Sequence, residues 1–219
     1  MITVLSHPDL RRITMPPDAA KTHEEILNSA KAEFLEYGFA DASLRRIAAN
    51  AGVTTGALYR HFRDKDALFN ALVAPVYNQF LEQYRASGER NLIQLEEVGM
   101  EPMWESSASS MIGFIEYIYA HFDTFKLLIN CSEQSPYEHF THTLVEMDVG
   151  FTSKYLKLAR VYGYPVRDVS ERELHFAVNA QFSCVLELVV HEVPYEEAMQ
   201  IFKNITRFIV AGWNALLME

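Results

Sequence analysis

The chain has 219 residues, of which 49% are hydrophobic, and a formal net charge of −10. Its two cysteines, Cys131 and Cys184, lie in apolar sequence without metal-ligand spacing, and no signal peptide or long uncharged span is visible, which argues against a disulfide-stapled, secreted or membrane-spanning protein. We therefore expect a soluble, reduced, cytoplasmic protein, large enough for one compact unit or two small ones.

Residues 1–20 contain three prolines and show no helical period. We expect them to form a flexible arm, although the arginines at its centre, Arg11 and Arg12, could instead enter a DNA minor groove. An amphipathic pattern then predicts a helix from about His23 to Tyr37. Gly38 is expected to end it, because glycine adopts a left-handed backbone at little cost.

Two short helices joined by a turn are predicted over residues 43–65. Ser43 can cap the first helix through its hydroxyl, and Gly52 ends that helix. Thr54 can cap the second helix, which turns Leu58 inward. The segment is thus predicted to be a helix-turn-helix whose second helix could enter a DNA major groove.

The same segment, SLRRIAANAGVTTGALYRHFRDK, carries five basic side chains and one acidic side chain within an acidic protein, which indicates contact with phosphate. Threonine hydroxyl and alanine methyl groups can meet base edges, whereas tyrosine, histidine and arginine side chains can hold phosphate oxygens. Lys65 opens a helix, where a cation opposes the helix dipole unless an anion is bound, so we interpret it as a phosphate contact. The candidate DNA-contacting residues are Ser43, Arg45, Arg46, Thr54, Thr55, Gly56, Ala57, Tyr59, Arg60, His61 and Lys65. The alternative is a solvated pair of amphipathic helices that binds no ligand.

Residues 23–72 resemble the DNA-binding domain of the TetR family of bacterial transcriptional regulators. The positions that match the family pattern are Phe34, Gly38, Phe39, Ile47, Ala48, Ala51, Gly52, Val53, Leu58, Tyr59, Phe62, Lys65 and Leu68. The resemblance implies that Ser43, Thr54, Thr55, Gly56, Ala57, Tyr59, His61 and Lys65 contact DNA. Many members carry Lys or Arg where this chain has Thr55, so the base preference stays open.

Beyond Lys65 the chain is helical by period. Pro75 removes a backbone donor and is expected to kink or end the helix that begins at Asp64 or Lys65. Further helices are predicted over residues 76–98, 104–121, 123–131, 137–162, 170–191 and 194–217, and Ser170 with Glu173 has the pattern of a capping box. Residues 76–219 hold ten basic and twenty acidic side chains, so we do not expect them to contact DNA.

The sequence therefore predicts an all-α protein with three parts. They are a flexible N-terminal arm at residues 1–20, a three-helix helix-turn-helix DNA-binding domain at residues 21–75, and a helical domain at residues 76–219. The resemblance implies that the last domain binds a small-molecule effector and forms the dimer.

The last two helices carry more apolar surface than a small monomer covers comfortably. The family resemblance points to a homodimer through these helices, whose two recognition helices would lie about 34–36 Å apart on a palindromic site. The candidate interface residues are Leu174, Val178, Val185, Leu188, Ile205, Phe208, Ile209 and Trp213.

The middle helices are rich in methionine and aromatic residues, which can line an adaptable apolar pocket. Candidate pocket residues are Met103, Trp104, Met111, Phe114, Tyr117, Phe140, Met147 and Phe151. The alternative for each of them is ordinary core packing, because pocket lining and core look alike in sequence. The resemblance implies an unidentified effector here, apolar or aromatic in character.

An enzyme is the main rival class. His139, His142 and Glu146 share a helical face that would permit a metal site, but an exposed polar face explains the same pattern. None of the eight histidines has a glutamate three positions before it, as a di-iron bundle requires. We therefore expect no catalytic site, cofactor or metal.

The function that we predict is a sequence-specific transcriptional repressor, released from a palindromic operator by a small-molecule effector. A helical protein-interaction module, or less readily a helical-bundle metalloenzyme, is the alternative.

Overall fold

The computed structural model describes residues 17–218, except the side chains of residues 17, 101–106 and 108. In the described residues the fold is all-helical, as predicted, with one isolated β-bridge between Val166 and Met218. The helices are α1 (Pro17–Asp41), α2 (Leu44–Asn50), α3 (Thr55–His61), α4 (Lys65–Glu97), α5 (Met100–Ala120), α6 (Phe122–Asn130), α7 (Phe140–Val161), α8 (Glu171–Val190) and α9 (Tyr195–Leu217).

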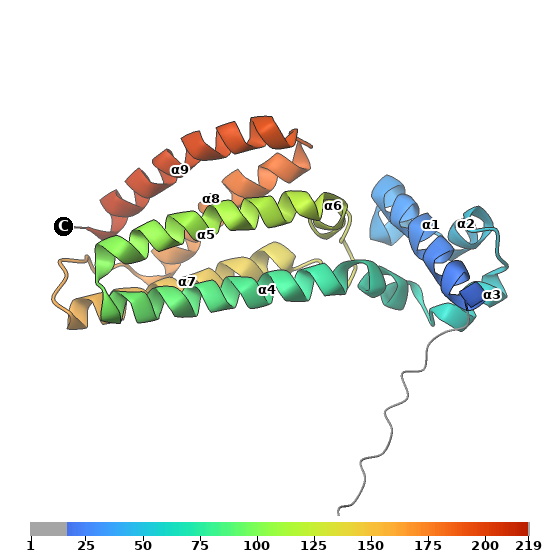
Figure 1. The fold of residues 1–219 in the computed structure, drawn as a ribbon, viewed down its shortest axis with the longest axis horizontal. Helices are drawn as coiled ribbons and strands as arrows, with labels where there is room; N and C mark the ends of the chain where they lie inside the picture. The colour runs from blue at the N-terminus through green and yellow to red at the C-terminus, as the bar shows by residue number, and fades with distance from the viewer. Residues whose placement is uncertain (1–16, 219) are drawn as a thin grey trace, which may run out of the picture.

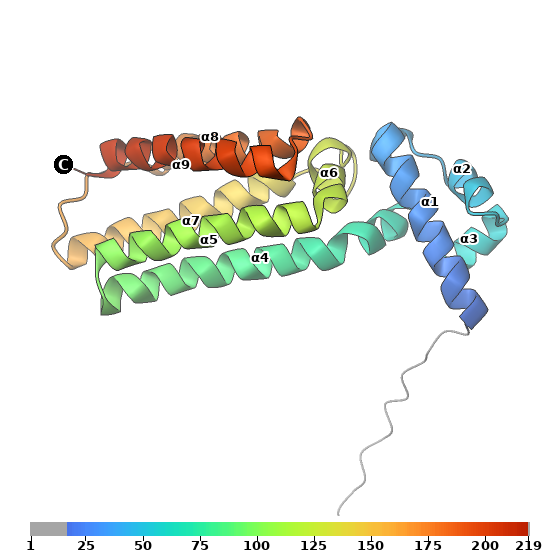
Figure 2. The same ribbon diagram turned by 45° about the horizontal axis from the view of Figure 1, so that its top comes forward.

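Helices α1, α2 and α3 form a unit at one end of the molecule, and α4 runs from that unit into a bundle with α5, α7, α8 and α9 (Figures 1 and 2). The short helix α6 lies between the bundle and α1 in both views. The fold thus sets a helix-turn-helix at the end of a helical body, and one long helix belongs to both.

The core of the N-terminal unit consists of side chains that the apolar pattern turns inward. Ile26, Phe34, Ile47 and Leu58 have no exposed surface. Gly38 leaves helical geometry at φ 73°, so the regular part of α1 ends where the sequence predicts. Only a short turn follows it.

The start of α1 differs from the prediction. The helix begins at Pro17 rather than near His23, so residues 17–20 belong to a helix instead of an arm. Proline suits the first helical position, because its missing N–H would have no partner there. The rest of the predicted arm, including Arg11 and Arg12, lies outside the described residues.

Pro75 does not end its helix. It lies inside α4, which continues to Glu97, so the two helices predicted on either side of Pro75 are one. Proline removes a single hydrogen bond, and α4 is packed both before and after that position: Phe69 lies 5.0 Å from the Phe34 ring of α1, and Phe80 lies 5.6 Å from the Phe114 ring of α5. The prediction of a helix end at Pro75 is therefore wrong.

The C-terminal helices begin and end within a few residues of their predicted bounds, α5 starting slightly earlier and α7 slightly later. The capping box at the start of α8 is confirmed: Ser170 Oγ accepts from Glu173 N at 3.3 Å, and Glu173 Oε2 accepts from Ser170 N at 2.9 Å. The Ser170 hydroxyl also donates to Glu173 Oε2 at 2.7 Å, and this bond, together with that from Ser170 N, lowers the pKa of Glu173.

The hydrophobic core is continuous between the two units. One cluster of buried side chains includes Ile47 and Leu58 next to the turn and Phe125 and Val178 in the bundle. Helix α6 adds polar links to α1, because Phe39 N donates to Cys131 O at 2.8 Å and Lys31 pairs with Asp123 at 2.8 Å. The bundle and the helix-turn-helix unit are therefore joined by packed side chains, so a movement of one would be passed to the other.

Candidate nucleic-acid interface and ligand pocket

The helix-turn-helix is fixed by caps on both of its helices. Ser43 Oγ accepts from Arg46 N at 3.4 Å, and Thr54 Oγ1 accepts from Ala57 N at 3.1 Å. Gly52 joins the helices at φ 67°, a conformation that glycine adopts without strain. Both predicted caps and the predicted turn glycine are present, so these local signals determine how α3 is presented.

Helix α3 turns one face inward and the other to solvent. Leu58 is completely buried, whereas the side chain of Tyr59 is 51% exposed. Thr54, Gly56 and Arg60 are exposed as well, and the remaining candidates Thr55, Ala57 and His61 are half-buried on the same helix. The exposed face is the one that the sequence assigns to base and phosphate contacts.

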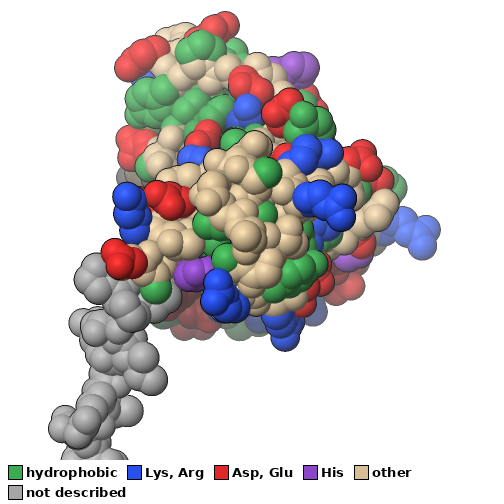
Figure 3. Space-filling view, turned by 90° about the vertical axis from the view of Figure 1, so that its right-hand side faces the viewer, with side chains coloured by type: hydrophobic (Ala, Val, Ile, Leu, Met, Phe, Trp, Pro, Cys, Tyr) green, Lys and Arg blue, Asp and Glu red, His purple; other side chains and the backbone are tan. Residues whose placement is uncertain are grey.

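Figure 3 shows this end of the molecule. Lysine and arginine side chains lie around an area of uncharged side chains and backbone. Arg45 of α2 and Arg60 of α3 are both exposed. This arrangement suits a duplex whose bases meet the central area while its phosphates meet the basic rim.

Arg46 has an internal partner that the sequence analysis missed. Its Nη2 lies 2.6 Å from Oε1 of Glu33, a side chain with only 3% of its residue surface exposed. Glu33 also accepts from Ser43 N at 2.7 Å, and the Arg46 guanidinium lies 4.3 Å from the Tyr37 ring centroid. The hydrogen bond that Arg46 donates to Glu33 raises the pKa of Arg46. Glu33 therefore holds the start of α2 against α1. Its position on the inward, apolar face of α1 was the sequence signal that could have identified this contact.

Lys65 also has internal contacts. Its Nζ donates to Ala40 O at 2.9 Å and Ala42 O at 3.4 Å, and lies 4.7 Å from the Phe39 ring centroid. Carbonyl groups at the C-terminal end of α1 thus offset a cation that the dipole of α4 alone would disfavour. These contacts tie α4 to α1, and any phosphate contact would use the remaining N–H of the ammonium group.

A cavity of about 200 Å³ lies inside the bundle, between α4, α5, α7, α8 and α9. Met111, Phe114 and Phe151 line it, as predicted for pocket residues. Tyr117 and Phe140 do not line it, since Tyr117 Oη donates to Val76 O at 3.3 Å and Phe140 is core. Met147 is also outside the lining, and the side chains of Met103 and Trp104 lie outside the described residues.

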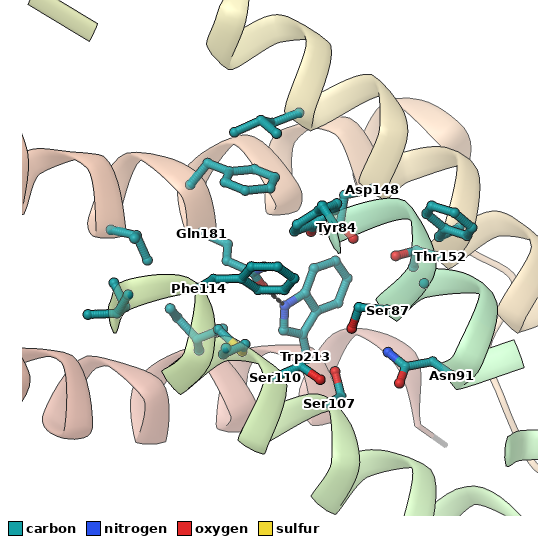
Figure 4. A pocket seen from close by; sticks show the side chains of 18 of the residues that line it. Tyr84, Ser87, Asn91, Ser107, Ser110, Phe114, Asp148, Thr152, Gln181 and Trp213 are labelled. Carbon is teal, nitrogen blue, oxygen red and sulfur yellow. Dashed lines mark hydrogen bonds between the residues drawn. The ribbon is translucent and has the colours of Figure 1, made fainter. Parts of the chain in front are cut away.

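The cavity has a polar component that the sequence analysis did not assign to it. In Figure 4, Tyr84 and Asp148 lie on one side of the Trp213 ring, and Ser87, Asn91 and Ser107 lie on the other. Trp213 Nε1 donates to Gln181 Oε1 at 2.6 Å. The pocket therefore combines aromatic walls with polar groups that can orient a ligand.

Asp148 carries the negative charge of this cavity. It keeps some accessible surface because it lines the cavity, yet it lies deep in the protein, and burial raises its pKa to about 6. A hydrogen bond from Tyr84 partly opposes that shift. Burial and the neighbouring Asp148 in turn raise the pKa of Tyr84 well above its usual value, so Tyr84 stays protonated and acts as a donor.

A family model described as "Bacterial regulatory proteins, tetR family" matches residues 26–72. Residues 26–72 are therefore similar to the DNA-binding domain of the TetR family. It is 47% identical over 53 residues to the HTH-type transcriptional repressor Rv1474c of Mycobacterium tuberculosis, an alignment covering 24% of this chain and 28% of that protein. It is 46% identical over 56 residues to the repressor BepR of Brucella suis, covering 26% and 27%. The matched part thus spans less than a third of the length of these relatives.

Solved TetR-family structures resemble the whole fold. SmeT of Stenotrophomonas maltophilia, named as the repressor of a multidrug efflux pump, has a TM-score of 0.59 at 20% identity and covers 91% of this chain and 93% of SmeT. A SmeT–triclosan complex has a TM-score of 0.56 at 21% identity, covering 90% and 92%. At these identities the likeness shows a shared fold.

The face that α8 and α9 leave exposed differs in part from the predicted interface. Leu174, Val178 and Leu188 are buried within the protomer, whereas Ile209, which is 7% exposed, still reaches the groove between α8 and α9. Val185, Ile205 and Trp213 are half-buried, and Phe208 is 74% exposed. A shallow apolar groove, lined by Ala177, Ala180, Gln181, Cys184, Phe208, Ile209, Gly212, Trp213 and Leu216, runs between the two helices. Phe176, 68% exposed on α8, adds apolar surface that the sequence analysis did not list.

The histidines considered as metal ligands are placed differently from a closed metal site. Glu146 Oε1 lies 3.3 Å from Nδ1 of His175, and the rings of His142 and His175 lie 6.3 Å apart. His139 lies beside Glu138 at 3.3 Å. Over the part of the chain that the structure describes, no group of three such ligands comes together.

Proposed function

We propose that the chain is a sequence-specific DNA-binding transcriptional repressor, which a small-molecule effector releases from a palindromic operator. The observation that carries this proposal is the capped helix α3, whose exposed face begins at Thr54 and lies within the matched residues 26–72. The repressor names of Rv1474c and BepR, which match over this same domain, support it. The protein would act in the cytoplasm, as a regulator rather than an enzyme.

In this proposal α3 occupies a major groove. Thr55, Gly56 and Ala57 face base edges from its first turn, because small side chains allow the backbone to come close to DNA. Ser43, Arg45, Thr54, Tyr59, Arg60, His61 and Lys65 are assigned to phosphates, which set position and salt dependence. Arg46 acts through its ion pair with Glu33 and holds α2 in place, while its exposed edge remains available to phosphate.

The active form would be a homodimer. Phe176 and Phe208 expose apolar surface on α8 and α9. In Figure 1, α9 lies on the side of the bundle opposite the long helix α4. A two-fold axis through this face would pair the same surface of two copies and give two recognition helices for a palindromic site. Burial of two phenylalanines per protomer removes apolar surface that a soluble monomer rarely exposes.

The effector would act through α4. Phe80 and Tyr84 of α4 line the cavity, and the same helix begins at Lys65, against the end of α1. A ligand that binds one arrangement of α4 better than another shifts the population toward that arrangement. The spacing of the two recognition helices would then no longer match the operator. The triclosan-bound form of SmeT, a protein with the same fold, supports a ligand-binding role for the bundle.

Selection of bound sequences from a randomised DNA pool at two salt concentrations tests the proposal. We expect recovery of a palindrome whose affinity falls steeply with salt, because the phosphate contacts release counterions. No enrichment at either salt by a protein that is dimeric in solution would overturn the proposal. The exposed groove of α8 and α9 would then be the better guide to function.

A further inference from the structure

The bundle cavity is unusual in its balance of charge. Eight of its lining residues are aromatic: Phe80, Tyr84, Phe114, Phe151, Tyr155, Phe182, Phe202 and Trp213. Among the described side chains of the lining, Asp148 is the single acidic residue, and none is a lysine, arginine or histidine. Lys154, whose ammonium lies 5.6 Å from the Phe151 ring centroid, is exposed and is not among the lining residues. Within the described chain, a deep carboxylate therefore faces the cavity without a cation of the protein beside it.

Other polar groups of the lining can also accept further hydrogen bonds. Tyr84 donates to Asp148, yet a carboxylate has two oxygens that can accept several hydrogen bonds. Asn91 Oδ1 is buried on the lining and has no hydrogen-bond partner in the described structure. Buried acceptors without donors are costly, so a ligand that supplies N–H donors would be stabilised here.

The aromatic walls favour the same kind of ligand. The Tyr84 and Phe114 rings lie 5.0 Å apart, and Phe80 lies 5.6 Å from Phe114. Such rings stack on an aromatic body, and their faces also attract a cation. An anionic ligand would meet Asp148 and the negative ring faces with no compensating positive charge.

We propose that the cavity binds an organic cation, a protonated amine carried on an aromatic or apolar body, with Asp148 as its counter-ion. The ammonium group lies at the Asp148 and Tyr84 end, and the body of the ligand packs against Phe114 and Trp213. The proposal deepens the proposed function, because it names the chemical class of the effector. It rests on that function only in assigning the occupant of the cavity to a regulatory role.

A set of three ligands of one shape tests the charge preference directly. Calorimetric titration of the full-length protein at pH 7.5 would compare 1-naphthylmethylammonium, neutral 1-naphthylmethanol and anionic 1-naphthoate. We expect the ammonium compound to bind about tenfold or more tightly than the alcohol, the gain of a hydrogen-bonded charge in a desolvated site, and the naphthoate to bind most weakly. Wild-type protein that prefers the alcohol or the naphthoate, or binds none of the three, overturns the proposal.

Two variants assign the preference to its residue. Asp148→Asn is expected to lose the preference for the ammonium compound while it keeps the affinity for the alcohol, and that retained binding shows an intact cavity. The matched control is Glu146→Gln, which removes one charge from the exposed face of the same helix and should change neither affinity. An Asp148→Asn variant that binds the ammonium compound as the wild type does would overturn the role of Asp148. The wild-type ranking needs no variant, so it decides the ligand class even if Asp148→Asn does not fold.

The same ligands separate this proposal from the proposed function. The operator recovered from the DNA pool would be titrated with protein in the absence and presence of 1-naphthylmethylammonium. Tight binding of the amine without any change in operator affinity supports the ligand class and contradicts release by an effector. Operator binding with no preference for the amine supports the DNA-binding function and contradicts the ligand class.

Discussion

The carboxylate of Glu33 and the guanidinium of Arg46 form a 2.6 Å ion pair beneath the start of α2. Glu33 also accepts from Arg46 Nε at 2.8 Å and from Ser43 N at 2.7 Å. One buried carboxylate thus fixes both the first residues of the helix-turn-helix and a basic side chain at its surface. Glu33 lies behind the DNA-facing surface, yet it is placed to control how the helix-turn-helix is presented to DNA.

We expect Glu33→Gln to weaken operator binding and to lower the thermal unfolding midpoint, because the amide cannot pair with the guanidinium and leaves the start of α2 less constrained. Glu24→Gln, on the exposed face of the same helix, is the control and should change neither quantity. Operator titration and thermal denaturation of both variants measure the effects. Equal behaviour of the two would show that Glu33 does not position α2.

Arg60→Ala should reduce affinity on every DNA sequence tested. If Arg60 neutralises one phosphate, its removal lowers the slope of log affinity against log salt by about 1. Arg172→Ala, an exposed change at the start of α8, should leave the slope unchanged. Titrations at several salt concentrations give the slope, and an unaltered value for Arg60→Ala would remove α3 from the docking face.

Phe208→Glu should convert the proposed dimer to a monomer. Loss of one buried phenylalanine on each protomer costs about 3–6 kcal/mol of association free energy per dimer, and two opposed carboxylates add repulsion. Ile93→Glu replaces an exposed apolar residue of α4, away from this face, and serves as the control. Sedimentation equilibrium reports the oligomeric state. A Phe208→Glu protein that stays dimeric would place the interface elsewhere.

Asp148→Asn should stabilise the protein at neutral pH and much less at acid pH. Burial raises the folded-state pKa of Asp148 to about 6, above its ordinary value of 3.8, so the folded state binds the proton more tightly than the unfolded state. The contribution of this group to stability is therefore complete at low pH and is lost as pH rises through about 6.

At pH 7.5 the ionised Asp148 lowers the free energy of unfolding by about 2–3 kcal/mol, and the asparagine avoids that loss. Urea denaturation of both proteins at pH 4.5 and pH 7.5 measures the difference. A stability gap between the two proteins that is the same at both pH values would contradict the assignment. Glu146→Gln, on the exposed face of α7, should show no such gap.

Gly88→Ala and Gly113→Ala should have different effects. A Cβ at Gly88 would lie 2.6 Å from the Phe151 ring, so the ring must shift toward the cavity, whereas a Cβ at Gly113 meets nothing within 4 Å. Both glycines lie inside helices, where replacing glycine by alanine otherwise raises the free energy of unfolding by about 0.5–1 kcal/mol. We expect Gly113→Ala to stabilise the protein and Gly88→Ala to weaken ligand binding in the cavity. Denaturation and calorimetric titration check the pair, and equal stabilisation with unchanged ligand binding would contradict the crowding at Phe151.

The predictions that succeeded from sequence depend on neighbouring residues. Ser43, Thr54 and Ser170 cap their helices through hydrogen bonds to groups three residues away, and Gly52 supplies a local backbone conformation. Such signals need no distant partner to be read. The helix-turn-helix could therefore be predicted closely, down to the residues that α3 presents.

The predictions that differed depend on what each helix packs against. An apolar stripe marks a buried face but does not say whether the protomer or a second copy covers it, so Leu174, Val178 and Leu188 were assigned to the dimer although the bundle itself buries them. Pro75 likewise carries a local signal to stop, which packing of α4 on α5 and α7 overrides.

By itself the sequence determined an all-helical chain with a basic, capped helix-turn-helix at its N-terminal end and an acidic helical remainder. Only the tertiary structure decided that Asp148 and Tyr84 lie together on the wall of a cavity while Phe140 and Tyr117 pack outside it. Caps and turns are set by hydrogen bonds within a few residues. A cavity is the space left when five helices from distant parts of the chain pack together, and no local pattern specifies that space.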